Sequence, residues 1–200
     1  MAQTRRRGEE LEDALLAAAW EELKEGGYQG FTMEAVAERA RTGRQVLYRR
    51  WPNKKDLVIA AISRYFDTNT VETPDTGTLR GDLIAYLVSA STARLELIAV
   101  FTVALAEYFD DSGESPADLR AQVLAGRRRG TDVIFERAAA RGEVEPSRLT
   151  PRMVALPFDL LRSELMMTRR PVPEQTIVEI VDDVVLPAVT SGAPARLSSP

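Results

Sequence analysis

Apolar residues recur along this chain at intervals of three and four, which is the spacing of one face of a helix. Leu16, Ala19, Trp20 and Leu23 form the first such run. No window alternates apolar and polar residues between turns, so no strand is predicted. The pattern predicts an all-α protein, with helices near 8–25, 33–40, 44–50, 54–69, 78–92, 94–109, 116–141, 150–169 and 174–190.

Capping and breaking residues set the first helix boundaries. Gly26 and Gly27 end the first helix, and Thr32 is a candidate N-cap for the second. The third helix must stop before Pro52, because the residue preceding a proline avoids helical angles. Asn53 then has the right chemistry to cap the fourth helix.

A polar stretch, TVETPDTG at 70–77, reads as a linker between two domains. The tail SGAPARLSSP has the composition of a disordered end. The predicted organisation is a helical head, a connecting helix, a larger helical domain and a tail, at residues 1–53, 54–69, 78–190 and 191–200 respectively.

Charge divides the chain in the same way. The net charge is −4, but residues 1–66 carry a net +2 and residues 67–200 a net −6. Seven basic residues and no acidic residue lie between Arg39 and Lys55. This asymmetry indicates a head that binds a polyanion and a separate acidic body.

The composition argues against most enzyme chemistry. The chain has no cysteine and no histidine, so thiolate nucleophiles, Ser-His pairs and the commonest metal ligand are missing. We therefore expect no enzyme activity, cofactor or metal. Four acidic residues could offer oxygen ligands to a divalent cation, but a solvated loop is the favoured interpretation: Glu107, Asp110, Asp111 and Glu114. No signal peptide or membrane-length apolar run occurs, and the lack of cysteine suits a cytoplasmic protein.

The second and third predicted helices are short and joined by a tight turn, which is a helix-turn-helix pattern. In the third, Leu47 and Trp51 share one face, and Gln45 and Arg49 lie roughly opposite. Arg44 and Tyr48 flank the outer face. Such a helix fits a major groove, where Arg, Gln and Tyr supply donors to phosphates and base edges.

These residues resemble the TetR family of bacterial transcriptional regulators. The stretch GGYQGFTMEAVAERA followed by LYRRWPNKKDL is similar to the family's N-terminal signature over about residues 10–60. GTLRGDLIAYL and ALPFDLL are similar to one subgroup of its ligand-binding domains. The resemblance implies a homodimer that binds a palindromic operator on double-stranded DNA and responds to a small-molecule effector.

The resemblance also implies which residues meet DNA. They are Thr32, Arg44, Gln45, Val46, Tyr48, Arg49, Arg50 and Lys54. Three positions depart from the family pattern. Arg41 replaces the usual turn glycine, which costs on the order of 1 kcal/mol if φ is positive. Gly43 replaces a Ser cap, and Val46 replaces a Thr but fits a thymine methyl.

From charge alone, the basic segment 44–55 could equally be a solvent-exposed surface with no binding partner. However, Arg44, Lys54 and Lys55 stand in first turns of helices, where cations oppose the helix dipole. A bound phosphate would reverse that effect.

Two other basic runs have simpler interpretations. Arg5–Arg7 is either an arm toward DNA or a solvated terminus, and Arg127–Arg129 is a solvated helix face.

Two apolar sets in the second half leave alternatives open. A ligand cavity or ordinary core would use Phe101, Leu105, Tyr108, Phe109, Phe158, Leu161, Met166 and Met167, and Pro157 should kink its helix. The stripe of the last helix packs in the chain's own core or, as the resemblance implies, forms the dimer interface: Ile177, Ile180, Val181, Val184 and Val185.

The leading hypothesis is a ligand-responsive repressor. A helical protein–protein adaptor with non-specific nucleic-acid affinity is the alternative, and sequence-blind binding would favour it. A carboxylate-dependent all-α enzyme is a third class, for which the sequence offers no candidate residue.

Overall fold

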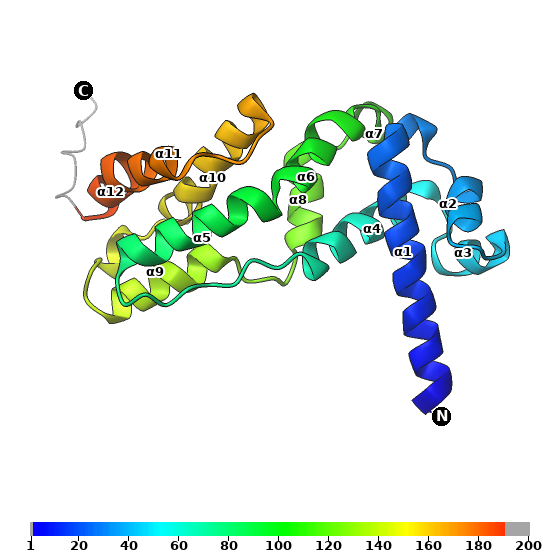
Figure 1. Ribbon diagram of the computed structural model, residues 1–200, viewed down its shortest axis with the longest axis horizontal. Helices are drawn as coiled ribbons and strands as arrows, with labels where there is room; N and C mark the ends of the chain where they lie inside the picture. The colour runs from blue at the N-terminus through cyan, green and yellow to red at the C-terminus, as the bar shows by residue number, and fades with distance from the viewer. Residues whose placement is uncertain (1, 191–200) are drawn as a thin grey trace, which may run out of the picture. The chain divides into compact units, whose positions relative to one another are not determined.

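The computed structural model describes residues 2–190, and the side chains of residues 8–190. The Arg5–Arg7 side chains and the 191–200 tail lie outside the described residues. Throughout the described range the regular elements are helices, and no strand occurs there, so the all-α prediction is confirmed (Figure 1). Within that range no single helix is long and apolar enough to cross a membrane; Leu79–Ala93 and Leu95–Ala104 meet that criterion only when counted together across a bend.

The chain forms two compact units. The first contains residues up to Thr70 and residues 96–127. Its elements are α1 (Ala2–Gly30), α2 (Met33–Arg39), α3 (Arg44–Arg50), α4 (Lys54–Thr68), α6 (Leu95–Ala99), the π-helical segment η1 (Val100–Ala104), α7 (Ala106–Ser112) and α8 (Pro116–Leu124).

The second unit contains residues 71–95 and the residues from Arg128 onward. Its elements are α5 (Leu79–Ala93), α9 (Gly130–Ala140), a 3-10 turn η2 (Pro146–Arg148), α10 (Pro151–Thr168), α11 (Glu174–Glu179), the π-helical segment η3 (Ile180–Val185) and α12 (Leu186–Thr190). The predicted domain limits at 53, 69 and 78 remain a prediction.

The core of the first unit is built around α1. Ala19 and Leu23 of α1 are fully buried and Leu16 and Trp20 nearly so, as the helical spacing predicted, and Leu15 is fully buried as well. They join a cluster that includes Leu47 of α3 and Leu57 of α4. Burying a leucine or isoleucine side chain contributes about 1.5–3 kcal/mol. The short helix α2 packs on α1, and α3 packs on α2 and joins the apolar cluster of α1 and α4 through Leu47.

Gly27 interrupts α1 near its end. Its φ of 62° and ψ of −175° are outside the helical region, so the regular helix stops there and one further turn follows. The prediction that the Gly26–Gly27 pair ends the helix is confirmed in this sense. Glycine adopts this left-handed φ without the Cβ penalty that other residues incur.

The prediction of one helix over 116–141 is wrong. α8 ends at Leu124, α9 begins at Gly130, and Gly126 between them has a φ of 73°. Consequently Arg127–Arg129 do not lie on a helix face. Gly126 in the left-handed region ends the helix, since glycine adopts this φ without a Cβ penalty. The three guanidinium groups pair with Asp67 of α4 and with Glu136 and Asp132 of α9.

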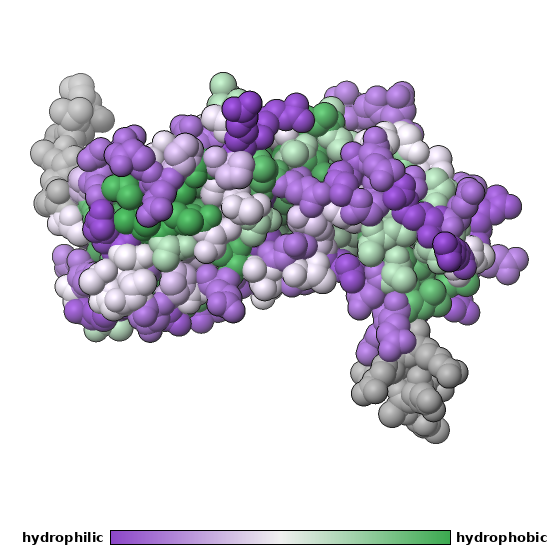
Figure 2. Space-filling view, in the orientation of Figure 1, coloured by the Kyte–Doolittle hydropathy of each residue, from purple (hydrophilic) through white to green (hydrophobic). Residues whose placement is uncertain are grey.

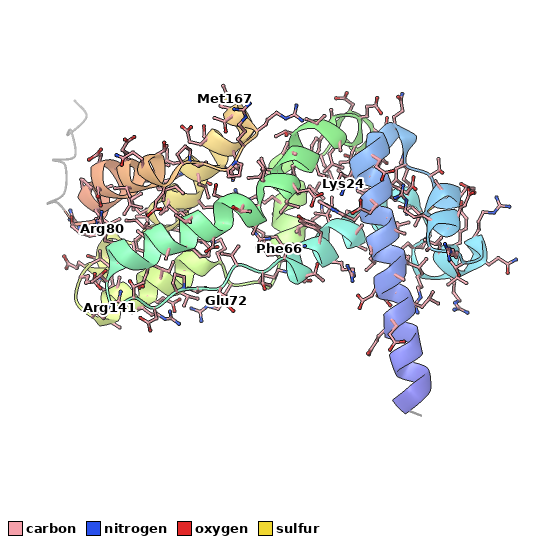
Figure 3. All side chains as sticks on the ribbon, viewed as in Figure 1. Lys24, Phe66, Glu72, Arg80, Arg141 and Met167 are labelled. Atoms are coloured by element: carbon pink, nitrogen blue, oxygen red, sulfur yellow. The ribbon has the colours of Figure 1, made fainter. Side chains whose placement is uncertain are left out.

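The second unit buries an acidic residue at the start of α5. Asp82 is fully buried and accepts hydrogen bonds from the backbone N–H (2.5 Å) and Oγ1 (2.8 Å) of Thr76, and from Arg141 (3.1 Å). Burial raises the pKa of Asp82, but these hydrogen bonds outweigh burial and hold the pKa below its ordinary value. Arg80 and Arg141 both lie near this end of the unit (Figure 3).

α10 runs without a break from Pro151 to Thr168 and includes Pro157. The apolar residues Leu161 and Leu165 of this helix are buried in the second unit. α10 ends at Arg169, which adopts a left-handed φ of 53° and donates its backbone N–H to Leu165.

Candidate nucleic-acid interface

The turn between α2 and α3 is tight and is held by backbone hydrogen bonds. Thr32 caps α2, because its Oγ1 accepts the backbone N–H of Ala35 at 3.1 Å. At the other end, the Thr42 N–H donates to the Ala37 carbonyl (2.9 Å) and the Arg41 N–H to that of Glu38 (3.0 Å). These paired bonds form a Schellman motif, which requires a left-handed residue after the cap.

Arg41 is that left-handed residue, with a φ of 52°. The strain cost predicted for Arg41 was conditional on a positive φ, and that condition is met. Gly43 follows as the N-cap of α3 with extended angles and no side-chain hydrogen bond, also as predicted. The turn thus sets the angle between α2 and α3 by backbone bonds at the cost of one strained residue.

α3 presents two chemically different sides. Leu47 is fully buried and Trp51, just after the helix, is nearly so. Gln45, Tyr48 and Arg49 are exposed, and 47 % of Tyr48 is accessible to solvent. Figure 2 shows strongly hydrophilic surface over this part of the first unit. The outer side therefore offers amide, phenol and guanidinium groups to an external partner.

The predicted DNA-contact residues at the edges of α3 differ in exposure and in their side-chain partners within the protein. Arg44 pairs with Glu34 at 3.2 Å, but the two side chains are 65 % and 53 % exposed. Such an exposed pair contributes at most about 1 kcal/mol, so Arg44 is readily released to a phosphate. Val46 is half-buried. Arg50 behaves differently: it donates to the Glu12 carboxylate and to the Gly8 carbonyl oxygen.

Lys54 opens α4, where Asn53 caps the helix by accepting the backbone N–H of Asp56 at 2.9 Å. The Lys54 ammonium lies 3.9 Å from the centre of the Tyr28 ring. Burial lowers the pKa of Lys54, partly offset by Asp111 and Glu107. The Lys54 ammonium therefore lies on an aromatic face beside a helix N-terminus. A phosphate oxygen bound there would accept hydrogen bonds from the ammonium and interact favourably with the N-terminus of α4.

Family models match both parts of the chain. Residues 15–61 match bacterial regulatory proteins of the tetR family, and residues 73–184 match the tetracyclin repressor-like C-terminal domain. The chain belongs to the TetR family. The resemblance inferred from the sequence is confirmed, and the protein is a transcriptional regulator of TetR type, a class that is not enzymatic.

Relatives of known classification cover nearly the whole TetR-family chain. An HTH-type transcriptional regulator of Mycobacterium tuberculosis is 33 % identical over 190 residues, covering 90 % of this chain and 88 % of the relative. The DNA-binding transcriptional repressor TetR of Mycobacteroides abscessus is 31 % identical over 194 residues, covering 94 % and 98 %.

Solved structures share the fold. The fatty acid degradation regulator FadR of Bacillus halodurans has a TM-score of 0.64 at 18 % identity, covering 88 % of this chain and 94 % of that one. A tetR-family regulator of Streptomyces coelicolor has a TM-score of 0.63 at 20 % identity, covering 88 % and 78 %.

The residues predicted to line a ligand cavity fall in both units. In the first unit, Leu105 and Tyr108 are fully buried, and Phe109 packs edge-to-face on Tyr108 at 5.4 Å. Phe101 is half-buried there. The remaining predicted residues belong to the second unit: Phe158 is half-buried, Leu161 is buried, and Met166 and Met167 are exposed. Met167 projects from the end of α10 (Figure 3).

The predicted dimer stripe is mostly internal to the second unit. Ile177, Val181 and Val185 are fully buried within this single chain, and Ile180 is nearly so. Their burial within one chain favours the alternative, the chain's own core, and their part in a dimer interface stays a prediction. Val184 is 44 % exposed and remains available for a contact.

The prediction that Glu107, Asp110, Asp111 and Glu114 form a solvated loop is wrong, because the first three lie on α7 and Glu114 belongs to a polar network inside the first unit. Glu114 accepts hydrogen bonds from Lys55 and from the buried Tyr108 hydroxyl, both at 2.6 Å. Lys55 and Tyr108 hold the pKa of Glu114 below its ordinary value, while burial and Glu114 raise that of Tyr108. Glu114 thus joins the start of α4 to α7. Partners 59 residues apart leave no local sequence signal.

Proposed function

We propose that this regulator is a ligand-responsive repressor that acts in the cytoplasm and binds a palindromic operator as a homodimer. The observation that carries the proposal is the exposed set Gln45, Tyr48 and Arg49 on a helix whose opposite side is buried. In this arrangement the outer side of α3 enters the major groove and reads base edges. Thr32, Arg44 and Lys54 supply phosphate contacts, which set affinity and orientation.

Recognition of a full operator requires a second protomer. One seven-residue helix reads few base pairs, and two related half-sites about one helical turn apart require two copies of α3. The second unit carries exposed apolar residues, Val88 and Val184, on α5 and η3, and Figure 2 shows hydrophobic surface among its helices. We assign the dimer contact to this exposed surface.

The effector response is proposed to pass through the Glu114 network. Tyr108 and Phe109 belong to the predicted ligand-lining set, and Tyr108 shares Glu114 with Lys55. Lys55 is adjacent to the proposed phosphate contact Lys54. A ligand that displaces Tyr108 would therefore alter the start of α4, and its differential affinity for the two arrangements would release the operator.

Selection of bound duplexes from a random pool tests the proposal, with and without candidate small molecules. A palindromic consensus that is lost on addition of one compound is the expected result. Salt-dependent binding with no consensus would contradict it and favour the adaptor alternative.

A further inference from the structure

Arg50 ends α3 but points back toward α1. Its Nη1 donates to the Glu12 carboxylate and its Nη2 donates to the Gly8 carbonyl oxygen at 3.2 Å. Only 27 % of the side chain is exposed, and its Nε is buried. One guanidinium therefore ties the last residue of α3 to two successive turns of α1, across 38 residues of sequence.

The neighbouring residue of α1 makes the matching contact to α4. Asp13 accepts a hydrogen bond from Arg64 of α4 at 2.8 Å. Consecutive acidic residues of α1 thus hold α3 and α4. This arrangement makes α1 a frame against which the orientation of α3 is set.

Arg50 differs from Arg44 in what a move to DNA would leave behind. The Arg44–Glu34 pair is exposed on both sides, so water replaces either partner at little cost. Arg50 is less exposed than Arg44, at 27 % against 65 %, although Glu12 is itself 45 % exposed. Moving Arg50 to DNA would break two hydrogen bonds, to Glu12 and to the Gly8 carbonyl, whereas moving Arg44 breaks one, which makes the Arg50 move the more costly.

We propose that Arg50 is a positioning residue, which holds α3 against α1 through Glu12 and Gly8 so that Gln45, Tyr48 and Arg49 face the bases. This inference rests on the proposed function, because it requires sequence-specific operator binding. It replaces the prediction, made from the resemblance, that Arg50 is itself a contact to DNA.

Replacement of Glu12 distinguishes a positioning role of Arg50 from a purely electrostatic effect, because the two predict opposite changes in operator affinity. Glu12→Gln removes a negative charge from the DNA-binding end of the molecule, and general electrostatics then predicts equal or tighter binding to any duplex. If Arg50 positions α3, the same change loosens the helix and weakens binding to the operator alone. Glu10→Gln is the matched control, because Glu10 is exposed on the same helix and pairs with no side chain that the structure describes.

The experiment is a fluorescence titration of the full-length wild type, Glu12→Gln, Glu10→Gln and Arg50→Ala at several salt concentrations. The probes are the operator selected from the random pool and a scrambled duplex of the same composition. Glu12→Gln and Arg50→Ala should bind the operator on the order of tenfold more weakly than wild type. Their salt slopes and their affinity for the scrambled duplex should match those of the wild type, and Glu10→Gln should lose no affinity for either.

Equal operator affinity of Glu12→Gln and Glu10→Gln would overturn the inference alone. So would a salt slope that falls by about one in Arg50→Ala, since that marks the loss of one phosphate contact. Circular dichroism melting checks that each variant is folded, and Glu12→Gln decides the matter by itself if Arg50→Ala does not fold. A wild type without sequence preference would overturn the proposed function together with this inference.

Discussion

Two regions of this regulator are rich in arginine, and they use their charge differently. In the run Arg127–Arg129 every arginine forms an ion pair: Arg127 with Asp67, Arg128 with Glu136, and Arg129 with Asp132. The Arg128–Glu136 pair is as exposed as the Arg44–Glu34 pair, with side chains 63 % and 66 % exposed. In the segment from Arg39 to Lys55, Arg49 is exposed and forms no ion pair with any side chain that the structure describes. The sequence shows both regions as basic runs, whereas the structure shows one as a folded loop.

The difference lies in where the carboxylates are. Arg39 pairs with Glu22 and Glu25 of α1, so even the basic segment contributes some of its charge to the fold. What favours DNA binding is therefore the subset of cations and polar groups that face outward, and not the number of basic residues. Four substitutions test this comparison.

Arg49→Ala should have the largest effect. If Arg49 contacts a base edge, its loss weakens operator binding by about 1–3 kcal/mol and affects a scrambled duplex far less. Arg128→Ala is the control from the other arginine run, and we expect it to leave DNA binding unchanged. Fluorescence titration measures both. Equal losses for the two variants would remove the distinction between the regions.

Lys54→Ala should weaken binding to every duplex by about 1.5 kcal/mol, the contribution of a hydrogen bond to a charged group. Because the lost contact is to a phosphate, the slope of log affinity against log salt should fall by about one. Titration at four salt concentrations gives the slope. A loss confined to the operator would instead place Lys54 on a base.

Arg41→Gly should stabilise the protein by up to about 1 kcal/mol, because glycine adopts the φ of 52° without strain. Arg41→Lys keeps the strain and should leave the free energy of unfolding unchanged. Urea denaturation distinguishes them. A destabilised Arg41→Gly variant would mean that the side chain, and not the backbone, decides the stability of this turn.

Asp67→Asn should have the smallest effect, since both side chains of the pair are partly exposed. The hydrogen bond from Arg127 holds the pKa of Asp67 below its ordinary value. A carboxylate with a lowered folded-state pKa stabilises the fold above its unfolded pKa of about 4, and this contribution disappears as the pH falls through the folded pKa.

The free energy of unfolding of the wild type should therefore exceed that of Asp67→Asn by less than about 1 kcal/mol at pH 7, and this difference should shrink as the pH falls below the unfolded pKa of about 4. Urea denaturation at both pH values measures the difference. Operator binding should be unchanged, and a binding defect would connect the loop to DNA recognition.

Local rules predicted the head well and tertiary partners poorly. Thr32, Asn53 and Leu47 act within a few residues or by helical spacing, so capping and periodicity were sufficient for them. The partners of Arg50 and Lys55 are brought close only by folding, and no spacing rule reaches across 38 or 59 residues.

In the C-terminal half of the chain, too, the sequence pattern did not identify tertiary partners. An apolar stripe indicates that a helix packs against something, but the arrangement of the other helices decides whether that surface belongs to the same chain or to a second one. Ile177, Val181 and Val185 face their own unit, which the resemblance to dimeric proteins did not reveal. The break at Gly126, where φ is 73°, was missed because a single glycine within a helical pattern is tolerated and does not by itself end a helix.

The central claim is that the outward side of α3 reads DNA sequence. The most direct test compares wild type with the triple variant Gln45→Ala, Tyr48→Ala and Arg49→Ala on the selected operator and on a scrambled duplex. All three side chains are exposed, so the fold should survive. The account predicts that the ratio of the two affinities falls to near one while scrambled-duplex binding persists. An unchanged ratio would contradict it.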